Sequence, residues 1–362
     1  MRAALLASAL LLAGCRQVAG VSTIVYEAGP NGGDGGNPNG CTNATLVLSS
    51  SDSLDLLYVA GGFDIVAVPD ENSATGLGYS NLHACSTSTP CTQPAGLLTL
   101  GFNDEVMDYA ASSSQIAYAI QTNTTTGAGA IHSVGFDGTN DKTLLASASF
   151  PSWITSSGSG TFWVSDDQTG DPATLHCIGC GGNTGDQTWI SNTDLTTTLG
   201  AFADASTVYV VADDGTGNGA NGIYTCSNAT ACGANAKVLV KGLQFSALNI
   251  KDEIATDGTN VYVTNESSAI ASITPAGVQT SIVKGVTTSA LAVDGATGDL
   301  FYGEENGTVA RAKSDGSSAP ETLSMCDPGS PDDIVAVAFD ATNVYVALVP
   351  VSGDSTVWAI KR

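Results

Sequence analysis

Short runs of β-branched and aromatic residues alternate with turn-forming residues along most of the chain. Examples are Ile116-Ala117-Tyr118-Ala119, Phe162-Trp163-Val164 and Val208-Tyr209-Val210, each flanked by Gly, Asp or Asn. Runs of this length and composition favour short strands, and the residues between them favour tight turns. With 42 Gly and only 13% charged residues in 362, the chain is poor material for helices. The pattern predicts an all-β protein.

The same run recurs seven times, about every 46 residues. Its central residues are Ala67, Tyr118, Trp163, Tyr209, Tyr262, Tyr302 and Tyr345. One four-stranded propeller blade has this size, so the repeat predicts a seven-bladed β-propeller over residues 42–362. The seventh unit has only three strands before Arg362. We expect the N-terminal strand Thr45–Ser50 to complete it and remove the open edges.

Charge narrows the classes of partner. The chain has 11 Lys and Arg against 35 Asp and Glu, a formal net charge of -24. Such a surface repels phosphate, so nucleic acid is not an expected partner. The sequence contains no nucleophile-elbow or Walker motif and indicates no organic cofactor. We expect a monomer.

The N-terminus has the pattern of an export signal. One cationic residue, Arg2, precedes an apolar stretch that is too short to span a membrane. Its end, Leu12-Ala13-Gly14-Cys15, resembles the lipobox of bacterial lipoproteins. That resemblance implies a signal peptide over residues 1–14 and a lipidated Cys15 held in the bacterial envelope. Arg16, in place of the Asp that retains lipoproteins at the inner membrane, favours the outer membrane. The alternative is an ordinary signal peptide with a chance cysteine.

The segment after the lipidated cysteine predicts a tether. Gly29–Gly40 is rich in Gly and Asn and has no apolar periodicity. We therefore expect residues 15–41 to form a flexible link between the membrane and the propeller. Because the net charge opposes adsorption to anionic lipid, attachment would have to be covalent.

Eight cysteines remain after Cys15, an even number for an exported protein. Cys85 and Cys91, like Cys226 and Cys232, have CX5C spacing, and Cys177 and Cys180 have CX2C spacing. Each pair starts at the end of a predicted third strand, which favours local disulfides. Cys41 and Cys326 remain and are expected to pair. A redox pair or half of a zinc site is the alternative for the CX2C motif.

Three histidines could form a metal set by number alone. His83, His132 and His176 lie in the predicted third strands of successive blades. Equivalent positions on packed sheets are about 10 Å apart or more, too far to share one ion. Tyr224 and Trp358 occupy the same position in other blades, which favours a packing role.

Acidic residues cluster on one predicted face of the propeller. Loops between second and third strands and the approaches to first strands should lie on this face. They carry Asp104, Glu105, Asp166, Asp167, Asp213, Asp214, Asp252, Glu253, Glu304, Glu305, Asp332 and Asp333. Such a set could attract a cationic partner, or Ca²⁺ at the channel mouth, since its ligands are all oxygens. The alternative is that these charges serve only solubility.

One tetrapeptide suggests a family. Tyr262-Val263-Thr264-Asn265 resembles the signature of YVTN-type propellers of bacterial surface proteins, and the general blade pattern is similar to NHL and TolB-like propellers. The resemblance implies a surface or periplasmic binding platform and carries over no catalytic residue. We therefore expect a non-catalytic binding or scaffold module, not an enzyme. The alternatives are a metal-dependent propeller enzyme of lactonase or lyase type and a purely structural surface adhesin.

Overall fold

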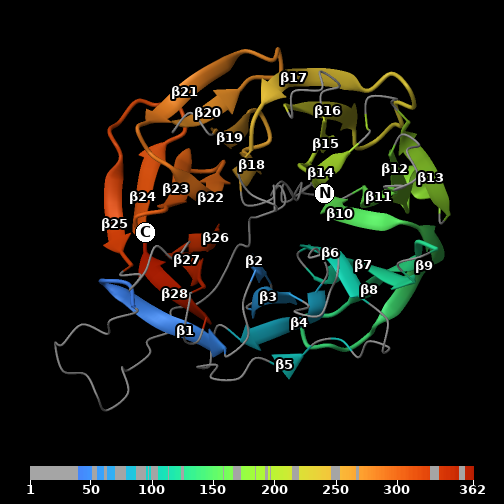
Figure 1. Cartoon of the computed structure of the whole chain (residues 1–362), viewed down its shortest axis with the longest axis horizontal. Helices are drawn as coiled ribbons and strands as arrows, with labels where there is room; N and C mark the ends of the chain where they lie inside the picture. Colours follow the sequence, from blue (N-terminus) through green and yellow to red (C-terminus); the bar gives the residue numbers. More distant parts are fainter. Residues whose placement is uncertain are drawn as a thin grey trace, which may run out of the picture.

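The strands form antiparallel sheets arranged in a ring, as the computed structural model shows (Figure 1). The structure describes residues 40–50, 55–60, 63–69, 79–86, 95–96, 98, 105–112, 114–123, 126–157, 159–165, 173–183, 185–191, 195, 197–213, 220–245, 253–265, 269–326, 334–349 and 355–362. The predicted signal peptide, Cys15 and the tether up to residue 39 lie outside these ranges. Among the described residues no helix has the length and hydropathy needed to cross a membrane.

We number the groups of strands as blades 1 to 7 in chain order. Blades 1 to 3 contain β2 (Asp55–Ala60), β3 (Phe63–Pro69), β4 (Tyr79–Ser86), β5 (Ala95–Gly96), β6 (Glu105–Ala111), β7 (Ile116–Asn123), β8 (Ala128–Val134), β9 (Lys142–Ser149), β10 (Pro151–Ser157), β11 (Gly160–Ser165), β12 (Thr174–Ile178) and β13 (Asp186–Ile190). The short 3₁₀ turn η1 (Cys180–Gly182) lies between β12 and β13.

Blades 4 to 7 continue the same order. They contain β14 (Thr198–Ala203), β15 (Thr207–Asp213), β16 (Asn221–Ser227), β17 (Lys237–Leu243), β18 (Ile254–Thr256), β19 (Val261–Asn265), β20 (Ala269–Ile273), β21 (Gln279–Lys284), β22 (Thr288–Asp294), β23 (Asp299–Glu304), β24 (Thr308–Lys313), β25 (Glu321–Met325), β26 (Ile334–Phe339), β27 (Asn343–Leu348) and β28 (Ser355–Lys361). The first strand of each blade lies nearest the centre of the ring (Figure 1).

Blades 1 and 2 are joined into one eight-stranded sheet, whereas the other blades are separate four-stranded sheets. The join is the single residue pair Tyr79↔Val106, between β4 and β6. In blade 1 the fourth strand, β5, has only two residues. The seven-blade count therefore depends on treating β2–β5 and β6–β9 as separate blades.

The N-terminal strand closes the ring, as the sequence predicts. β1 (Ala44–Ser50) pairs antiparallel with β28, so that the last sheet has the order β1-β28-β27-β26. Its side chains Val47 and Leu48 are buried in a cluster with Leu57 of blade 1. The first and last described strands thus share one blade, and β1 lies on the perimeter (Figure 1).

Within the described part of the chain, the core consists of seven apolar clusters, each between successive blades. Both faces of a blade are therefore buried. The repeat aligns the recurring aromatic residues as equivalent, but in the structure they do not share one register position. Tyr118, Trp163 and Tyr302 pack against the preceding blade. Tyr209, Tyr262 and Tyr345 pack against the following blade. Alternate residues of a strand point to opposite faces, so a shift of one residue changes the neighbour.

Candidate functional site

The turns between first and second strands lie on one side of the ring, which we call the turn face. The loops between second and third strands and the links between blades lie on the other side, the connection face. This division follows from the antiparallel order of strands within each blade. It separates two sets of acidic residues with different environments.

On the turn face, aspartates are part of the fold. One oxygen of Asp204 accepts hydrogen bonds from the N–H groups of Ser206 and Thr207, and the other accepts one from the Tyr209 hydroxyl at 2.8 Å. Asp257 and Asp340 cap their turns in the same way. Tyr262 and Tyr345, five residues further on, each donate at 2.7 Å to these carboxylates. The aspartates thus cap their turns, and each also has a tyrosine partner that turn chemistry alone does not reveal.

Blade 6 replaces the tyrosine with an arginine from the end of the chain. Its residue packed against the following blade is Phe301, which has no hydroxyl to offer the Asp294 carboxylate. Arg362 binds Asp294 instead, and its guanidinium lies over the rings of Phe301 and Phe339 at 4.9 and 5.3 Å. Asp294 is 3% exposed. Burial would raise the pKa of this carboxyl, but hydrogen bonds from Arg362, Ala296 and Thr297 outweigh burial and lower it.

The tyrosine hydroxyls allow a matched test. Burial and the hydrogen bond to Asp257 raise the pKa of Tyr262 to about 12, so the hydroxyl is a donor at neutral pH. Tyr262→Phe should lower the free energy of unfolding by about 1–1.5 kcal/mol, because the half-buried Asp257 carboxylate loses a donor. The buried Tyr302 hydroxyl has no hydrogen-bond partner among the residues that the structure describes. Tyr302→Phe should therefore leave the stability within about 0.5 kcal/mol of wild type or raise it. Urea unfolding measures both; equal losses would contradict the assignment.

Two histidines are packed between aromatic rings and carboxylates. His176 stacks on Trp163 at 4.3 Å, and its Nδ1 lies 3.2 Å from Asp186, which also accepts a bond from Trp163 Nε1 at 3.1 Å. Burial lowers the pKa of His176, against the opposite effect of Asp186. In blade 2, His132 contacts the equivalent pair, Tyr118 and Asp141, with its ring tilted on that of Tyr118 at 5.3 Å. These contacts agree with a packing role.

His83 lies opposite Val66 in blade 1, and its side chain is outside the described residues. In blades 2 and 3 a histidine of the third strand lies opposite the aromatic residue of the second strand, in the pairs Tyr118↔His132 and Trp163↔His176. In blades 4 and 7 an aromatic residue takes the place of the histidine and lies opposite valine, in the pairs Val210↔Tyr224 and Val346↔Trp358. Among the described residues, no group of three or more His, Cys, Asp or Glu side chains could hold a metal ion.

Side chains near the channel connect neighbouring inner strands. Six of the seven inner strands contain a register shift near their start. In β6 and β10 the residue after the shift reaches the following blade. In β6 this residue is Asp108, which is fully buried and accepts a hydrogen bond from the Ile154 N–H of blade 3 at 2.8 Å. In β10 it is Trp153, whose Nε1 donates to the Thr198 carbonyl of blade 4 at 3.1 Å. Neither role can be recognised from the local sequence.

The acids predicted on the connection face differ in exposure. Glu305 is exposed, Glu304 and Asp213 are half-buried, and burial raises the pKa of Glu304. Glu253 departs from the predicted exposed rim, because it is completely buried beside β18. Glu105 is the first residue of β6, with no side chain described. The remaining predicted acids lie outside the described residues, namely Asp104, Asp166, Asp167, Asp214, Asp252, Asp332 and Asp333.

Two of the disulfides link residues within one blade, and a third joins the N-terminal segment to the end of blade 6. Cys177–Cys180 and Cys226–Cys232 join residues with Cα atoms 5.9 Å apart, and Cys41 is joined to Cys326. These are the pairs that the sequence predicts; for the fourth pair, Cys91 lies outside the described residues. Gly160 is required beside the first disulfide, since a Cβ there would lie 2.6 Å from Cys180 Sγ. The redox and zinc alternatives for the CX2C motif stay untested.

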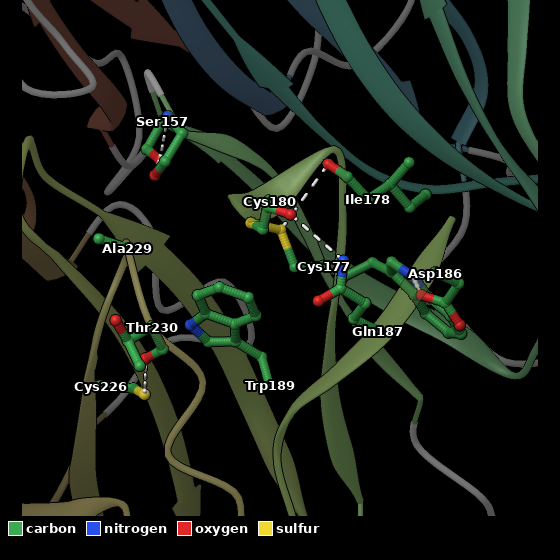
Figure 2. The surroundings of a disulfide bond; sticks show 12 residues. Ser157, Cys177, Ile178, Cys180, Asp186, Gln187, Trp189, Cys226, Ala229 and Thr230 are labelled. Carbon is green, nitrogen blue, oxygen red and sulfur yellow. Dashed lines mark hydrogen bonds between the residues drawn. A yellow bond between two sulfur atoms is a disulfide. The ribbon is translucent and has the colours of Figure 1, made fainter. Parts of the chain in front are cut away.

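Both local disulfides belong to the cluster between blades 3 and 4, with Trp189 (Figure 2). The Cys226–Cys232 loop also reaches the outer strand of blade 3. There the N–H of Cys232 donates to the Trp189 carbonyl at 3.0 Å, and Gly233 forms a parallel bridge with Ile190. The loop therefore protects part of an edge strand.

Known proteins resemble this chain in fold. No protein-family model and no curated protein matches the sequence. Similar solved structures include YCF48 bound to a D1 peptide (9% identity, TM-score 0.56, 90% of this chain and 96% of that one). A chain of the Mitotic Checkpoint Complex is also similar (10%, 0.56, 96% and 99%). The third is a prolyl endopeptidase (16%, 0.58, 87% and 47%), of whose length this chain spans about half.

The fold is a β-propeller. At these identities the likeness establishes architecture alone, and it extends to neither the YVTN nor the NHL type. One of these similar structures is bound to a peptide and another is part of a multiprotein complex. No catalytic role follows from the endopeptidase, because only its overall fold is shared with this chain.

Proposed function

We propose that the chain is a lipid-anchored, non-catalytic binding module of the bacterial envelope whose connection face attracts a cationic partner. This choice of face is supported by the acids of the turn face, whose carboxylates are already occupied by hydrogen bonds within the fold. Asp204, Asp257 and Asp340 each engage both carboxylate oxygens in turn caps and tyrosine hydrogen bonds. Their charge is therefore less accessible to a partner than that of acids in open loops.

The connection face holds the acids that remain for recognition. Glu305 is exposed there, and the sequence order assigns Asp332 and Asp333 to the link between blades 6 and 7 on the same side. A surface that carries several carboxylates concentrates cations and speeds encounter with a basic partner. A Lys- or Arg-rich peptide segment is the partner chemistry that fits.

A charge-matched pair of variants tests the face. Glu305→Gln/Asp332→Asn/Asp333→Asn should weaken binding of a fluorescent decalysine peptide at least about fivefold, because it removes three carboxylates from the contact. Asp137→Asn/Asp315→Asn/Glu321→Gln changes the net charge equally at exposed positions outside that face and should change the Kd less than about twofold. Equal weakening in both would show attraction by net charge alone and contradict a specific face. Titration with Ca²⁺ by calorimetry on the same variants tests the metal alternative.

The lipid anchor is tested separately. A Gly-rich link of about 25 residues between Cys15 and Cys41 would span about 25–30 Å and reach the perimeter of the ring at β1. Cys15→Ser should move the protein from the membrane to the soluble fraction and abolish labelling by an alkyne analogue of palmitate. Cys41→Ser, as a matched cysteine control, should keep the label. Retained label in Cys15→Ser would refute the anchor.

A further inference from the structure

The closing strand β1 is held along its length by contacts with blades 7 and 1. Along its length it pairs with β28 from Ala44↔Ile360 to Ser50↔Ser355. It also fills the cluster between blades 7 and 1 with Val47, which is 4% exposed, and Leu48, which is fully buried. Without β1, the edge of β28 and these apolar contacts would be open.

The start of β1 is attached to a different blade. Thr42 donates its N–H to the Met325 carbonyl at 2.9 Å, and its own carbonyl accepts from Ser324 Oγ at 2.6 Å. The Met325 N–H donates to Thr42 Oγ1 at 3.0 Å. Directly beside these bonds, Cys41 is joined to Cys326 at the end of blade 6. The N-terminal segment is therefore held to blade 6 before it enters blade 7.

This disulfide differs from the other two that the described residues contain. Its cysteines are 285 positions apart, whereas the others are separated by 3 and 6. The short loops constrain a single hairpin each, but a bridge over almost the whole propeller constrains the ring itself. Cys41 and Cys326 are 8% and 1% exposed, so reduction requires that the segment first move.

We propose that Cys41–Cys326 is a redox-controlled link that holds β1 in place and so keeps the ring closed. In the dithiol form β1 is held only by its ladder with β28, by two buried side chains and by the hydrogen bonds of Thr42 to blade 6, so it detaches more often. Thiol–disulfide exchange with an external disulfide, such as oxidised glutathione, forms this link. The two cysteine thiols are oxidised by two electrons and lose two protons, and the external disulfide is reduced to two thiols. The ring is thus fastened only after the chain reaches an oxidising compartment. This inference does not depend on the acidic face or on the lipid anchor.

The test is hydrogen exchange of the full chain in detergent, comparing wild type with Cys41→Ser/Cys326→Ser. Amides of β1 should exchange at least about tenfold faster in the variant, because the open state is more populated. Amides of β15, in blade 4, should stay within about twofold of wild type. Cys226→Ser/Cys232→Ser removes a local disulfide and should leave β1 protected.

A second measurement covers the case in which the variant fails to fold. Oxidised wild type is treated with graded dithiothreitol, the state of each disulfide is read by peptide mass spectrometry, and exchange is followed in the same samples. Exchange of β1 should rise in step with loss of Cys41–Cys326. Unchanged exchange in β1 after this bridge is reduced, or an equal rise in every blade, would overturn the proposal.

Discussion

Arg362→Ala is expected to lower the free energy of unfolding by about 2–3 kcal/mol, because it leaves a buried carboxylate without its cation. The Arg362 guanidinium pairs with Asp294 and donates through Nη1 to the Asp340 carbonyl at 2.7 Å. It also covers the rings of Phe301 and Phe339 between blades 6 and 7. Urea unfolding followed by tryptophan fluorescence measures the loss.

Arg362→Lys separates the charge from the shape of the side chain. Lysine keeps one positive charge but has no planar fork to serve the carboxylate, the carbonyl and two rings at once. It should recover less than half of the loss. Full recovery would show that charge alone matters and would contradict the role assigned to the guanidinium.

The same pair predicts a pH dependence. The pKa of Asp294 is lowered in the folded protein, so this group contributes stability above its ordinary pKa and loses it as the pH falls through the folded value. The difference in stability between wild type and Arg362→Ala should therefore be largest above about pH 5 and shrink at lower pH. A difference that grows on acidification would contradict this assignment.

Asp108→Ala should cost about 3 kcal/mol, since it strands two buried backbone donors. Asp108 accepts from its neighbour Tyr109 N–H at 2.7 Å and from Ile154 N–H at 2.8 Å, across the boundary between blades 2 and 3. Asp108→Asn keeps one acceptor oxygen and should cost about half as much. Urea unfolding measures both variants.

Exposed aspartates provide the comparison for this site. Asp137 caps an exposed turn through Thr139, and Asp137→Ala should shift the urea midpoint far less than Asp108→Ala. A loss in Asp108→Ala no larger than that in Asp137→Ala would show that the inner strands do not depend on this carboxylate.

The repeat and the cysteine spacing were readable because they follow from local chemistry. Period-two strands, Asp-led turns and CX5C or CX2C loops depend on residues that are close in sequence. The closing strand could also be predicted, since one unit lacked a strand and an unused strand preceded the first. Register was harder: Tyr118 and Tyr262 look equivalent as aromatic residues between branched neighbours, although a one-residue shift places them against opposite blades.

The roles of isolated polar residues could not be predicted. Nothing local distinguishes Asp108 from an exposed aspartate, because its partner N–H lies 46 residues away. Arg362 meets Asp294 across 68 residues for the same reason. Glu253 belongs to an acidic pair that predicts exposure, yet the packing of blade 5 buries it.

The sequence by itself determined the all-β architecture, the length of the repeat and three of the cysteine pairs, namely Cys177–Cys180, Cys226–Cys232 and Cys41–Cys326. These features depend on backbone preference, on the alternation of side chains and on the number and spacing of strands and cysteines, all of which can be read from the order of residues. Only the tertiary structure decided which blade each aromatic residue contacts, which carboxylates are buried and which cation serves them. Those outcomes depend on how neighbouring sheets pack around the ring, where residues far apart in the chain come within hydrogen-bonding distance.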